Sequence, residues 1–357
     1  MVRYCMSKFG SRIAQLEETK KITRLFHRQA IVWMMFVLIE FSLSVQAAAA
    51  EKINASYGAI SGTMSPIWVA KEARLFEKQG LDLNLVYIPG GPRSIMSLLG
   101  GSVQFVNHSG MPALEAYQRG ADTALIASSM NRLEHAIMVQ KNIDDVEQLR
   151  GKVLGISTVG SLTDILMREG LRLNGLSEKD VTILPLGDEA ARLIGLKTGR
   201  VQGAIISGIQ RLTATKMGFK PLIDFAKLPI EVSGSSMLVR RFYVTKNPDI
   251  TLRFLKAWIE GIYLLKSKRE LALGVLKKYV AGQDAEVLNA IYAQNKEQLS
   301  TKPIPYARVA KSMFNLLSRT NPEIPSAANP EGFAEPRFIN ELESAGFFEE
   351  MNRQYAK

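Results

Sequence analysis

Cysteine is nearly absent from this sequence, since Cys5 is the single cysteine among 357 residues. Because Cys5 lies within a predicted leader peptide, the exported part of the chain would contain no disulfide, thiol nucleophile or cysteine metal cluster. Histidine is also scarce. Beyond the first fifty residues only His108 and His135 occur, and no second ligand-type residue stands at metal-binding spacing from either. We therefore expect neither a bound metal nor a cofactor.

Two other function classes lack their sequence signals. No Gly-x-Ser-x-Gly elbow with plausible partners is present, which argues against a hydrolase. The chain has 45 Lys and Arg against 34 Asp and Glu, but the basic residues do not cluster with aromatic ones, so we expect no nucleic-acid partner. Without the first fifty residues, 38 basic and 31 acidic residues leave a net charge of +7. This modest excess favours attraction of anionic small molecules.

Residues 1–49 have the layout of a secretory signal peptide. A basic region precedes an apolar run over residues 30–39, and a stretch of small residues follows. We predict cleavage after Ala47 or Ala49. The alternative is an uncleaved membrane anchor, but Glu40 interrupts the run, which is shorter than the roughly 20 apolar residues of a membrane span.

The segment 55–93 organises the rest of the chain, because its pattern predicts a complete βαβ unit. A strand leads into a polar turn at residues 62–65, a helix begins at Pro66 and ends at Gly80, and a strand covers residues 81–85. Such a unit brings strand C-termini and a helix N-terminus to one sheet edge, where small ligands bind in open α/β folds. The free N–H groups of a helix start favour an anionic ligand.

The same pattern returns about one hundred residues later. A strand at 153–156, a polar glycine turn at 157–161 and a helix at 162–173 repeat the opening unit. The segment Gly101–Ser109 also matches Gly199–Ser207 in its Gly, Val, Gln and Ser positions, at an offset of 98 residues. We therefore predict two duplicated lobes.

The lobes are discontinuous in the chain. The first connection into the second lobe is predicted at Ala136, and the return is predicted through an extended segment, residues 235–245, after which the chain is helical. We assign residues 51–135 with 236–357 to lobe 1 and residues 136–235 to lobe 2. The predicted fold class is α/β, with a mainly parallel sheet flanked by helices in each lobe.

Several of these segments resemble a known family, the periplasmic solute-binding proteins of ABC importers. The likeness is to the sulfonate/nitrate/taurine group, which shares its fold with the thiamine-pyrimidine synthase-like proteins. It covers most of residues 52–235. Besides the leader peptide, the carrying segments are Ala70–Leu83, Gly90-Gly91, Gly101–Ser109, Asp145–Val153 and Gly155–Ser161. The resemblance implies a two-lobe periplasmic-binding-protein fold, type II-like, with two crossover strands.

The resemblance also implies a function. The chain would be an extracytoplasmic, periplasmic, monomeric protein that clamps a small anionic ligand between its lobes by hinge closure and works with an ABC permease in the inner membrane. It would not be an enzyme, because pyrimidine-synthase chemistry in the family goes with a cysteine-rich iron motif, and Cys5, the single cysteine, lies in the predicted leader peptide. A membrane-anchored sensing or partner-binding domain is the alternative, which an intact N-terminus on the mature protein would favour. Sulfonates, nitrate, carboxylates, aromatic acids and pyrimidines remain open as ligands.

In such proteins the anionic head of the ligand lies against helix N-termini and against Ser, Thr or Gly turns from both lobes. The corresponding lobe 1 residues here are Ser61, Gly62, Thr63, Met64, Gly91, Pro92, Arg93, Ser109, Gly110 and Met111. The corresponding lobe 2 residues are Thr158, Val159, Gly160, Ser161, Asp188, Glu189 and Ser207.

Some of these residues also have structural interpretations. Thr63 and Ser161 are expected to cap helices, each with a stabilisation of about 1 kcal/mol, and a capping turn can also contact a ligand. Arg93 is a cation at a helix start, a mildly unfavourable place, so an acidic partner or ligand is expected. His108 is expected as a hydrogen-bonding residue at a strand end. The acidic side chains expected to be solvated are Asp164, Glu169, Asp188 and Glu189, although Glu189 could face an amine or hydroxyl of the ligand.

Overall fold

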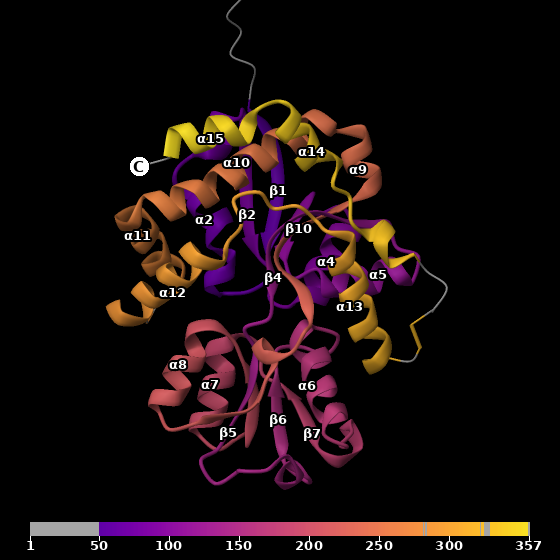
Figure 1. Cartoon of the computed structure of the whole chain (residues 1–357). Coiled ribbons are helices and arrows are strands. Elements are labelled where there is room, and N and C mark those ends of the chain that lie inside the picture. Colours follow the sequence, from indigo (N-terminus) through magenta and orange to yellow (C-terminus); the bar gives the residue numbers. More distant parts are fainter. Residues whose placement is uncertain (1–49, 281, 283, 322, 325–328, 356–357) are drawn as a thin grey trace, which may run out of the picture. The chain divides into compact units, whose positions relative to one another are not determined.

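A computed structural model describes residues 50–280, 282, 284–321, 323–324 and 329–355 (Figure 1). The predicted signal peptide, residues 1–49, lies outside the described residues. Ala50–Lys357 form one compact unit. Among the helices described in this unit, none is both long enough and apolar enough to cross a membrane.

The first sheet contains five strands of the described region, in the order β2-β1-β3-β10-β4. Their bounds are β1 (Glu51–Tyr57), β2 (Leu81–Tyr87), β3 (Phe105–His108), β4 (Thr123–Arg132) and β10 (Glu231–Arg240). β1 pairs in parallel with β2 and β3, whereas β10 runs antiparallel to β3 and β4. The parallel strands therefore end at one edge of the sheet, as the opening βαβ pattern predicts.

The second sheet repeats this topology, in the order β7-β6-β8-β5-β9. Its strands are β5 (Ala136–Val139), β6 (Val153–Ile156), β7 (Thr182–Pro185), β8 (Gly203–Ile206) and β9 (Lys220–Asp224). β6 pairs in parallel with β7 and β8, and β5 runs antiparallel to β8 and β9. The fourth strand of each sheet, β10 in the first and β5 in the second, is therefore the strand that directly follows a strand of the other sheet in the sequence.

Hydrogen bonds confirm the predicted internal repeat and explain its residues. The Gln104 side chain accepts from the backbone N–H of Asn54 at 2.9 Å, and the Gln104 N–H donates to the Asn54 carbonyl at 2.8 Å. Gln202 makes the same two bonds with Val153, at 3.0 and 2.8 Å. Each glutamine amide also donates to the carbonyl of the glycine three positions before it. The repeated Gly-x-Val-Gln pattern thus builds the same strand-entry turn twice.

Helices cover both faces of each sheet (Figure 1). The core that holds Trp68 and Trp258 joins one face of the first sheet to α2 (Ser65–Glu72), α3 (Leu75–Lys78), α10 (Pro248–Ser267), α11 (Arg269–Tyr279), α12 (Ala285–Gln298), α14 (Arg337–Ser344) and α15 (Phe347–Tyr355). A second core contains α4 (Gly91–Leu99), α5 (Met111–Gln118), α13 (Ala307–Thr320) and α6 (Leu162–Leu173). A third core packs α7 (Glu189–Lys197) and α8 (Gly208–Lys216) on the second sheet.

The chain passes between the two sheets twice. Residues 133–135 connect β4 with β5, and residues 225–230 connect β9 with β10. The two connections lie close together, because Glu231 at the start of β10 pairs with Arg132 at the end of β4. Two crossings are thus present, but they lie at residues 133–135 and 225–230 rather than at Ala136 and residues 235–245, which belong to β5 and to β10 with α9.

The structure shortens one predicted element and contains two helices that were not predicted. The return segment is extended only to Arg240, because α9 (Arg241–Lys246) follows at once. α8 was not predicted, since its Gly and Thr residues have low helix propensity and Ser207-Gly208 reads as a turn. α15 was also missed, because Gly346 ends α14 in a left-handed conformation with φ of 73° and a new helix begins one residue later.

Candidate functional site

A cavity of about 400 Å³ lies where the parallel strands of both sheets end. Its walls come from the segments after β1, β2 and β3 of the first sheet, after β6, β7 and β8 of the second, and from the first crossing with the adjoining parts of β4 and β10. The volume is within the range of small-molecule sites. The cavity is therefore the candidate ligand site.

Two hydroxyl groups of the first sheet's opening turn form one wall. The Ser61 side chain accepts from the backbone N–H of Thr63 at 3.5 Å and so caps the short 3-10 helix η1 (Gly62–Met64). Its hydroxyl lies 3.2 Å from the Thr63 hydroxyl. The predicted capping role of Thr63 is therefore wrong, since Ser61 caps η1 and α2 begins without a side-chain cap.

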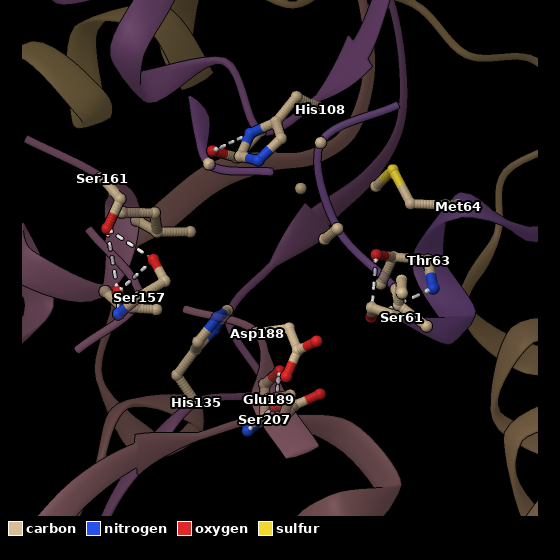
Figure 2. A pocket seen from close by; sticks show the side chains of 18 of the residues that line it. Ser61, Thr63, Met64, His108, His135, Ser157, Ser161, Asp188, Glu189 and Ser207 are labelled. Atoms are coloured by element: carbon tan, nitrogen blue, oxygen red, sulfur yellow. Dashed lines mark hydrogen bonds between the residues drawn. The ribbon is translucent and has the colours of Figure 1, made fainter. Parts of the chain in front are cut away.

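A matching group of hydroxyls lies across the cavity (Figure 2). Ser157, Ser161 and Thr163 are linked by three hydroxyl contacts of 2.8 Å. Ser161 also accepts from the Asp164 N–H at 3.4 Å and caps α6, as predicted. Beside this group, the buried Thr158 hydroxyl has no hydrogen-bond partner among the described residues. These hydroxyl groups are uncharged, so they can donate hydrogen bonds to a ligand without bringing a charge of their own into the cavity.

His108 lies at the end of β3 and lines the cavity. Its Nδ1 is 3.3 Å from the Ser109 hydroxyl, which agrees with the predicted role of a hydrogen-bonding residue at a strand end. Burial lowers the pKa of His108 to about 4. The imidazole is therefore neutral at physiological pH and offers one donor and one acceptor.

A buried ionic group closes the side of the second sheet. Glu189 Oε1 accepts from both the backbone N–H and the hydroxyl of Ser207, each at 2.6 Å. Arg192 lies 3.7 Å from Glu189 and donates to the carbonyls of Ile205 and Gly187, both at 2.7 Å. The predicted solvated Glu189 is therefore wrong: its side chain is buried and bonded.

Two other acidic residues also differ from the expectation. Asp164 and Glu169 are buried, with 3% and 1% exposure. Asp164 pairs with Arg168 at 2.9 Å, and Glu169 pairs with Arg172 at 2.7 Å. Both belong to α6, and their ion pairs make them structural groups rather than solvated charges. Asp188 is half-buried and caps α7 by accepting from the Ala191 N–H at 2.9 Å.

Glu134 and His135 bring the first crossing into the cavity. Burial, together with the nearby Glu189 charge, raises the pKa of Glu134 to about 7, against the opposing effects of the Gln294 amide and the Arg211 charge. Burial lowers the pKa of His135 to about 3, with Arg192 and Arg211 acting in the same direction. Glu134 Oε1 and His135 Nδ1 are both buried without a hydrogen-bond partner in the part of the chain that is described.

Tyr87 reaches the cavity from the end of β2. Burial raises the pKa of its phenol, and the charge of Asp188 adds to this effect, so Tyr87 of the first sheet faces the α7 start of the second. The phenol stays protonated and can donate or accept a hydrogen bond.

The predicted site residues divide into two sets. Those that line the cavity are Ser61, Thr63, Met64, Arg93, Ser109, Thr158, Ser161, Asp188, Glu189 and Ser207. Those that do not line it are Gly62, Gly91, Pro92, Gly110, Met111, Val159 and Gly160. Arg93 makes no ion pair with the described residues, and no group of three or more His, Cys, Asp or Glu in the described region could hold a metal.

Sequence reasoning missed His108, Arg132 and Thr163 as lining residues, and also the following five: Tyr87, Glu134, His135, Ser157 and Arg192. Two of them had a usable signal, because Tyr87 and Ser157 directly end or follow a strand of the parallel set. The other three had none, since Glu134 and His135 lie in a crossing and Arg192 lies inside a helix. Only the tertiary structure brings them to the cavity.

Comparison with known proteins places this fold and site in context. A protein of Escherichia coli (strain K12) named "Putative aliphatic sulfonates-binding protein" is 27% identical over 271 residues, which is 74% of this chain and 83% of the relative. A "Putative binding protein YtlA" of Bacillus subtilis (strain 168) is 22% identical over 291 residues, 77% of this chain and 85% of the relative.

Solved structures share the fold. The alkanesulfonate-binding protein SsuA from Xanthomonas axonopodis pv. citri, bound to MOPS, matches with a TM-score of 0.67 and 22% identity over 81% of this chain and 99% of that one. The two-sheet architecture is thus the periplasmic-binding-protein fold predicted from the sequence. The NMT1/THI5-like family model matches residues 62–270. With more than half of its length matched, from the first hydroxyl turn of the cavity to the start of α11, this chain belongs to the NMT1/THI5-like family.

Proposed function

We propose that this chain is the periplasmic solute-binding component of an ABC importer, and that it binds a small anionic solute in the cavity between its two sheets. The observation that carries the proposal is the convergence of hydroxyl-bearing helix starts from both sheets on one cavity. Ser61 and Thr63 stand on one side, and Ser157 and Ser161 on the other. Named binding proteins among the relatives support the transport role.

The α6 start supplies the strongest anion attraction in this proposal. α6 has 12 residues, and its first turn is capped by the neutral Ser161 rather than by a carboxylate. Its first turn also holds Asp164, but that carboxylate is paired with Arg168 at 2.9 Å. The helix dipole and the free N–H groups therefore still favour a negative charge. The α7 start differs, because Asp188 already supplies its negative cap. An anionic head is accordingly proposed to lie nearer to α6 than to α7.

The two crossings supply the hinge in this proposal. Besides these connections, α13 contacts α6 in the second core, and Arg319 of α13 pairs with Glu169 of α6 at 3.0 Å. A Cβ added at Gly90 would lie 3.0 Å from the Thr158 side chain, so the β2–α4 turn already touches the turn before α6. A solute that bonds both walls binds the closed arrangement better than the open one and shifts the population toward it.

A thermal-shift panel tests the proposal. The purified protein, expressed from the full-length gene, is heated with sulfonates, nitrate, aliphatic and aromatic carboxylates and pyrimidines. A solute present at 100 times its Kd adds about 2.7 kcal/mol to the stability of the folded state. We expect at least one acidic solute to raise Tm by several degrees. A panel in which no solute raises Tm contradicts the proposal.

Ser161→Ala locates the solute. The variant loses the α6 cap, which costs about 1 kcal/mol of stability, and also loses a hydroxyl at the cavity, so we expect the Kd of the identified solute to rise at least tenfold. Ser177→Ala is the matched control, because Ser177 caps the exposed 3-10 helix η3 (Glu178–Asp180) and does not line the cavity. Equal affinity in the two variants would remove Ser161 from the site.

Sequencing the N-terminus of the mature protein tests export. We expect it to begin after Ala47 or Ala49. A mature protein that retains residues 1–49 would instead favour the membrane-anchored sensor.

A further inference from the structure

Asn295 of α12 is a buried residue that holds the turn after β1, although 233 positions separate it from Gly62 in that turn. Its side chain is 2% exposed and does not line the cavity. Its Nδ2 donates to the Gly62 carbonyl and lies 2.8 Å from both this oxygen and the Ser65 hydroxyl. Ser65 in turn donates to the same carbonyl at 2.6 Å. Asn295 is therefore bonded to the first residue of η1 and to the residue that follows η1.

The neighbouring carbonyl groups of this turn are bonded as well. The Ser61 carbonyl accepts from the Met64 N–H at 3.0 Å. The Thr63 carbonyl accepts from the hydroxyl of Ser235, a fully buried residue of β10, at 2.7 Å. The backbone acceptors of the turn are thus occupied by donors of the protein, whereas the side chains of Ser61 and Thr63 line the cavity.

The helix that carries Asn295 is itself anchored against the turn. Ile291 and Tyr292 of α12 are buried in the core that also holds α2 and α10. A Cβ added at Gly62 would lie 2.5 Å from the Ile291 side chain and 3.4 Å from Asn295 Nδ2. Glycine at position 62 therefore allows the backbone of the turn to approach α12 closely, and the amide of Asn295 meets it there.

We propose that Asn295 is a positioning residue of the solute site, which holds the η1 turn so that the hydroxyls of Ser61 and Thr63 face the bound solute. This inference rests on the proposed function, because it assumes that the cavity holds the transported solute. Ser235 holds the same turn from β10. Neither Asn295 nor Ser235 lines the cavity, so each acts on the solute through the turn.

Asn295→Asp tests the hold on the turn without any solute. The carboxylate keeps the shape of the amide but replaces a donor by a negative acceptor beside the Gly62 carbonyl oxygen. We expect the hydrogen-bonded amides of Met64 and Ser65 to exchange with deuterium at least tenfold faster, because exchange reports local opening. Mass spectrometry of peptides from the full-length gene product measures the exchange.

Asn289→Asp is the matched control for this measurement. Asn289 lies on the same helix, but its Nδ2 donates to the Ala285 carbonyl of α12 itself, at 2.8 Å, and its side chain does not line the cavity. Exchange of the turn that is no faster in Asn295→Asp than in the control would overturn the inference and leave the proposed function intact.

Solute affinity connects the turn with the site. Titration calorimetry with ethanesulfonate, nitrate, propionate and benzoate at pH 7 gives Kd for the natural chain and for both variants. We expect each acid that binds the natural chain to bind Asn295→Asp at least tenfold more weakly and to bind Asn289→Asp equally well. Equal affinity of the two variants would overturn the role of Asn295. A natural chain that binds none of the four acids contradicts the proposed function and with it this role.

Acidification separates the lost donor from a general disturbance of packing. The carboxyl introduced by Asn295→Asp is buried beside two acceptors, and the titratable residues of the small cavity next to it are Glu134 and Glu189. Burial and these acidic neighbours favour its protonated form, whose O–H can donate to the Gly62 carbonyl again. We therefore expect the tenfold difference in Kd between the natural chain and the variant to fall below threefold at pH 5. A difference that stays the same at pH 5 would assign the loss to packing and overturn the role of the Asn295 donor.

Discussion

Gly58→Ala should displace the His108 ring from the cavity wall. Gly58 follows β1, and its backbone is held on both sides: its N–H donates to the Asn107 carbonyl at 3.2 Å, and its carbonyl accepts from the Gly90 N–H at 3.1 Å. A Cβ at Gly58 would lie 1.8, 2.6 and 2.9 Å from three atoms of the His108 ring. The backbone cannot retreat without breaking a strand connection, so the ring must move.

The opposite side of the ring is also occupied, which sets the size of the effect. A Cβ at Gly91 would lie 3.1 Å from His108 Cε1, so the imidazole fills a slot between two glycine turns. Overpacking of this kind costs about 1–3 kcal/mol. At this chain length that corresponds to a fall in Tm of about 2–6 °C. Because His108 lines the cavity, the affinity for the solute should fall as well.

A double-mutant cycle tests this reasoning. The proteins are the natural chain, Gly58→Ala, His108→Ala and the double variant, each unfolded by heat and by urea. In the His108→Ala background the slot is empty, so adding Gly58→Ala should cost less than about 0.5 kcal/mol, and the two changes should show a coupling of about 1–3 kcal/mol. An equal cost of Gly58→Ala in both backgrounds would refute the ring clash as its cause.

Two further predictions concern stability. Gly261→Ala in α10 should lower the stability by about 1–3 kcal/mol, because its Cβ would lie 2.6 Å from the Pro66 carbonyl oxygen of α2. Gly274→Ala in α11 has nothing within 4 Å of its Cβ and should raise the stability by about 0.5–1 kcal/mol. Urea unfolding that ranks the two variants in the reverse order contradicts the packing argument. Between pH 7 and pH 5 the two buried histidines, whose pKa values of about 4 and about 3 lie below the ordinary 6.5, should lose about 3–4 kcal/mol of stability, because the unfolded chain binds protons first. The raised pKa of Glu134, about 7, acts in the opposite direction and stabilises the folded chain by about 2 kcal/mol over the same interval. Glu134→Gln should therefore lose stability more steeply on acidification than the natural chain. Identical pH profiles of the two proteins would contradict this sign.

Local signals predicted most of the secondary structure. β6 and α6 coincide with the ranges expected from apolar periodicity, because each is bounded by glycine or by a capping residue that acts on its immediate neighbours. Ser161 was predictable as a cap for the same reason, since its hydrogen bond spans three residues. α8 was not predictable, because its stability comes from packing on the second sheet rather than from propensity.

Burial of charge was the feature that the sequence could not reveal. Glu169 looks like a solvated helix residue, yet Arg319 reaches it from 150 residues away, at 3.0 Å. Glu189 is likewise bonded by Ser207, 18 residues later. Partners this distant leave no periodic pattern in the chain, so the expectation of solvated carboxylates failed wherever the partner came from another element.

The sequence by itself determined most of the order of strands and helices, the duplication and the turns at the carboxyl ends of the strands, because these depend on spacing, on glycine and on hydrogen bonds between near neighbours such as Gln202 and Gly199. Only the tertiary structure decided which polar groups share the cavity. Glu134, His135 and Arg192 meet the hydroxyl walls because two crossings bring the ends of two sheets together. Their altered pKa values follow from that burial and not from any local motif, since desolvation depends on all the atoms packed around a group.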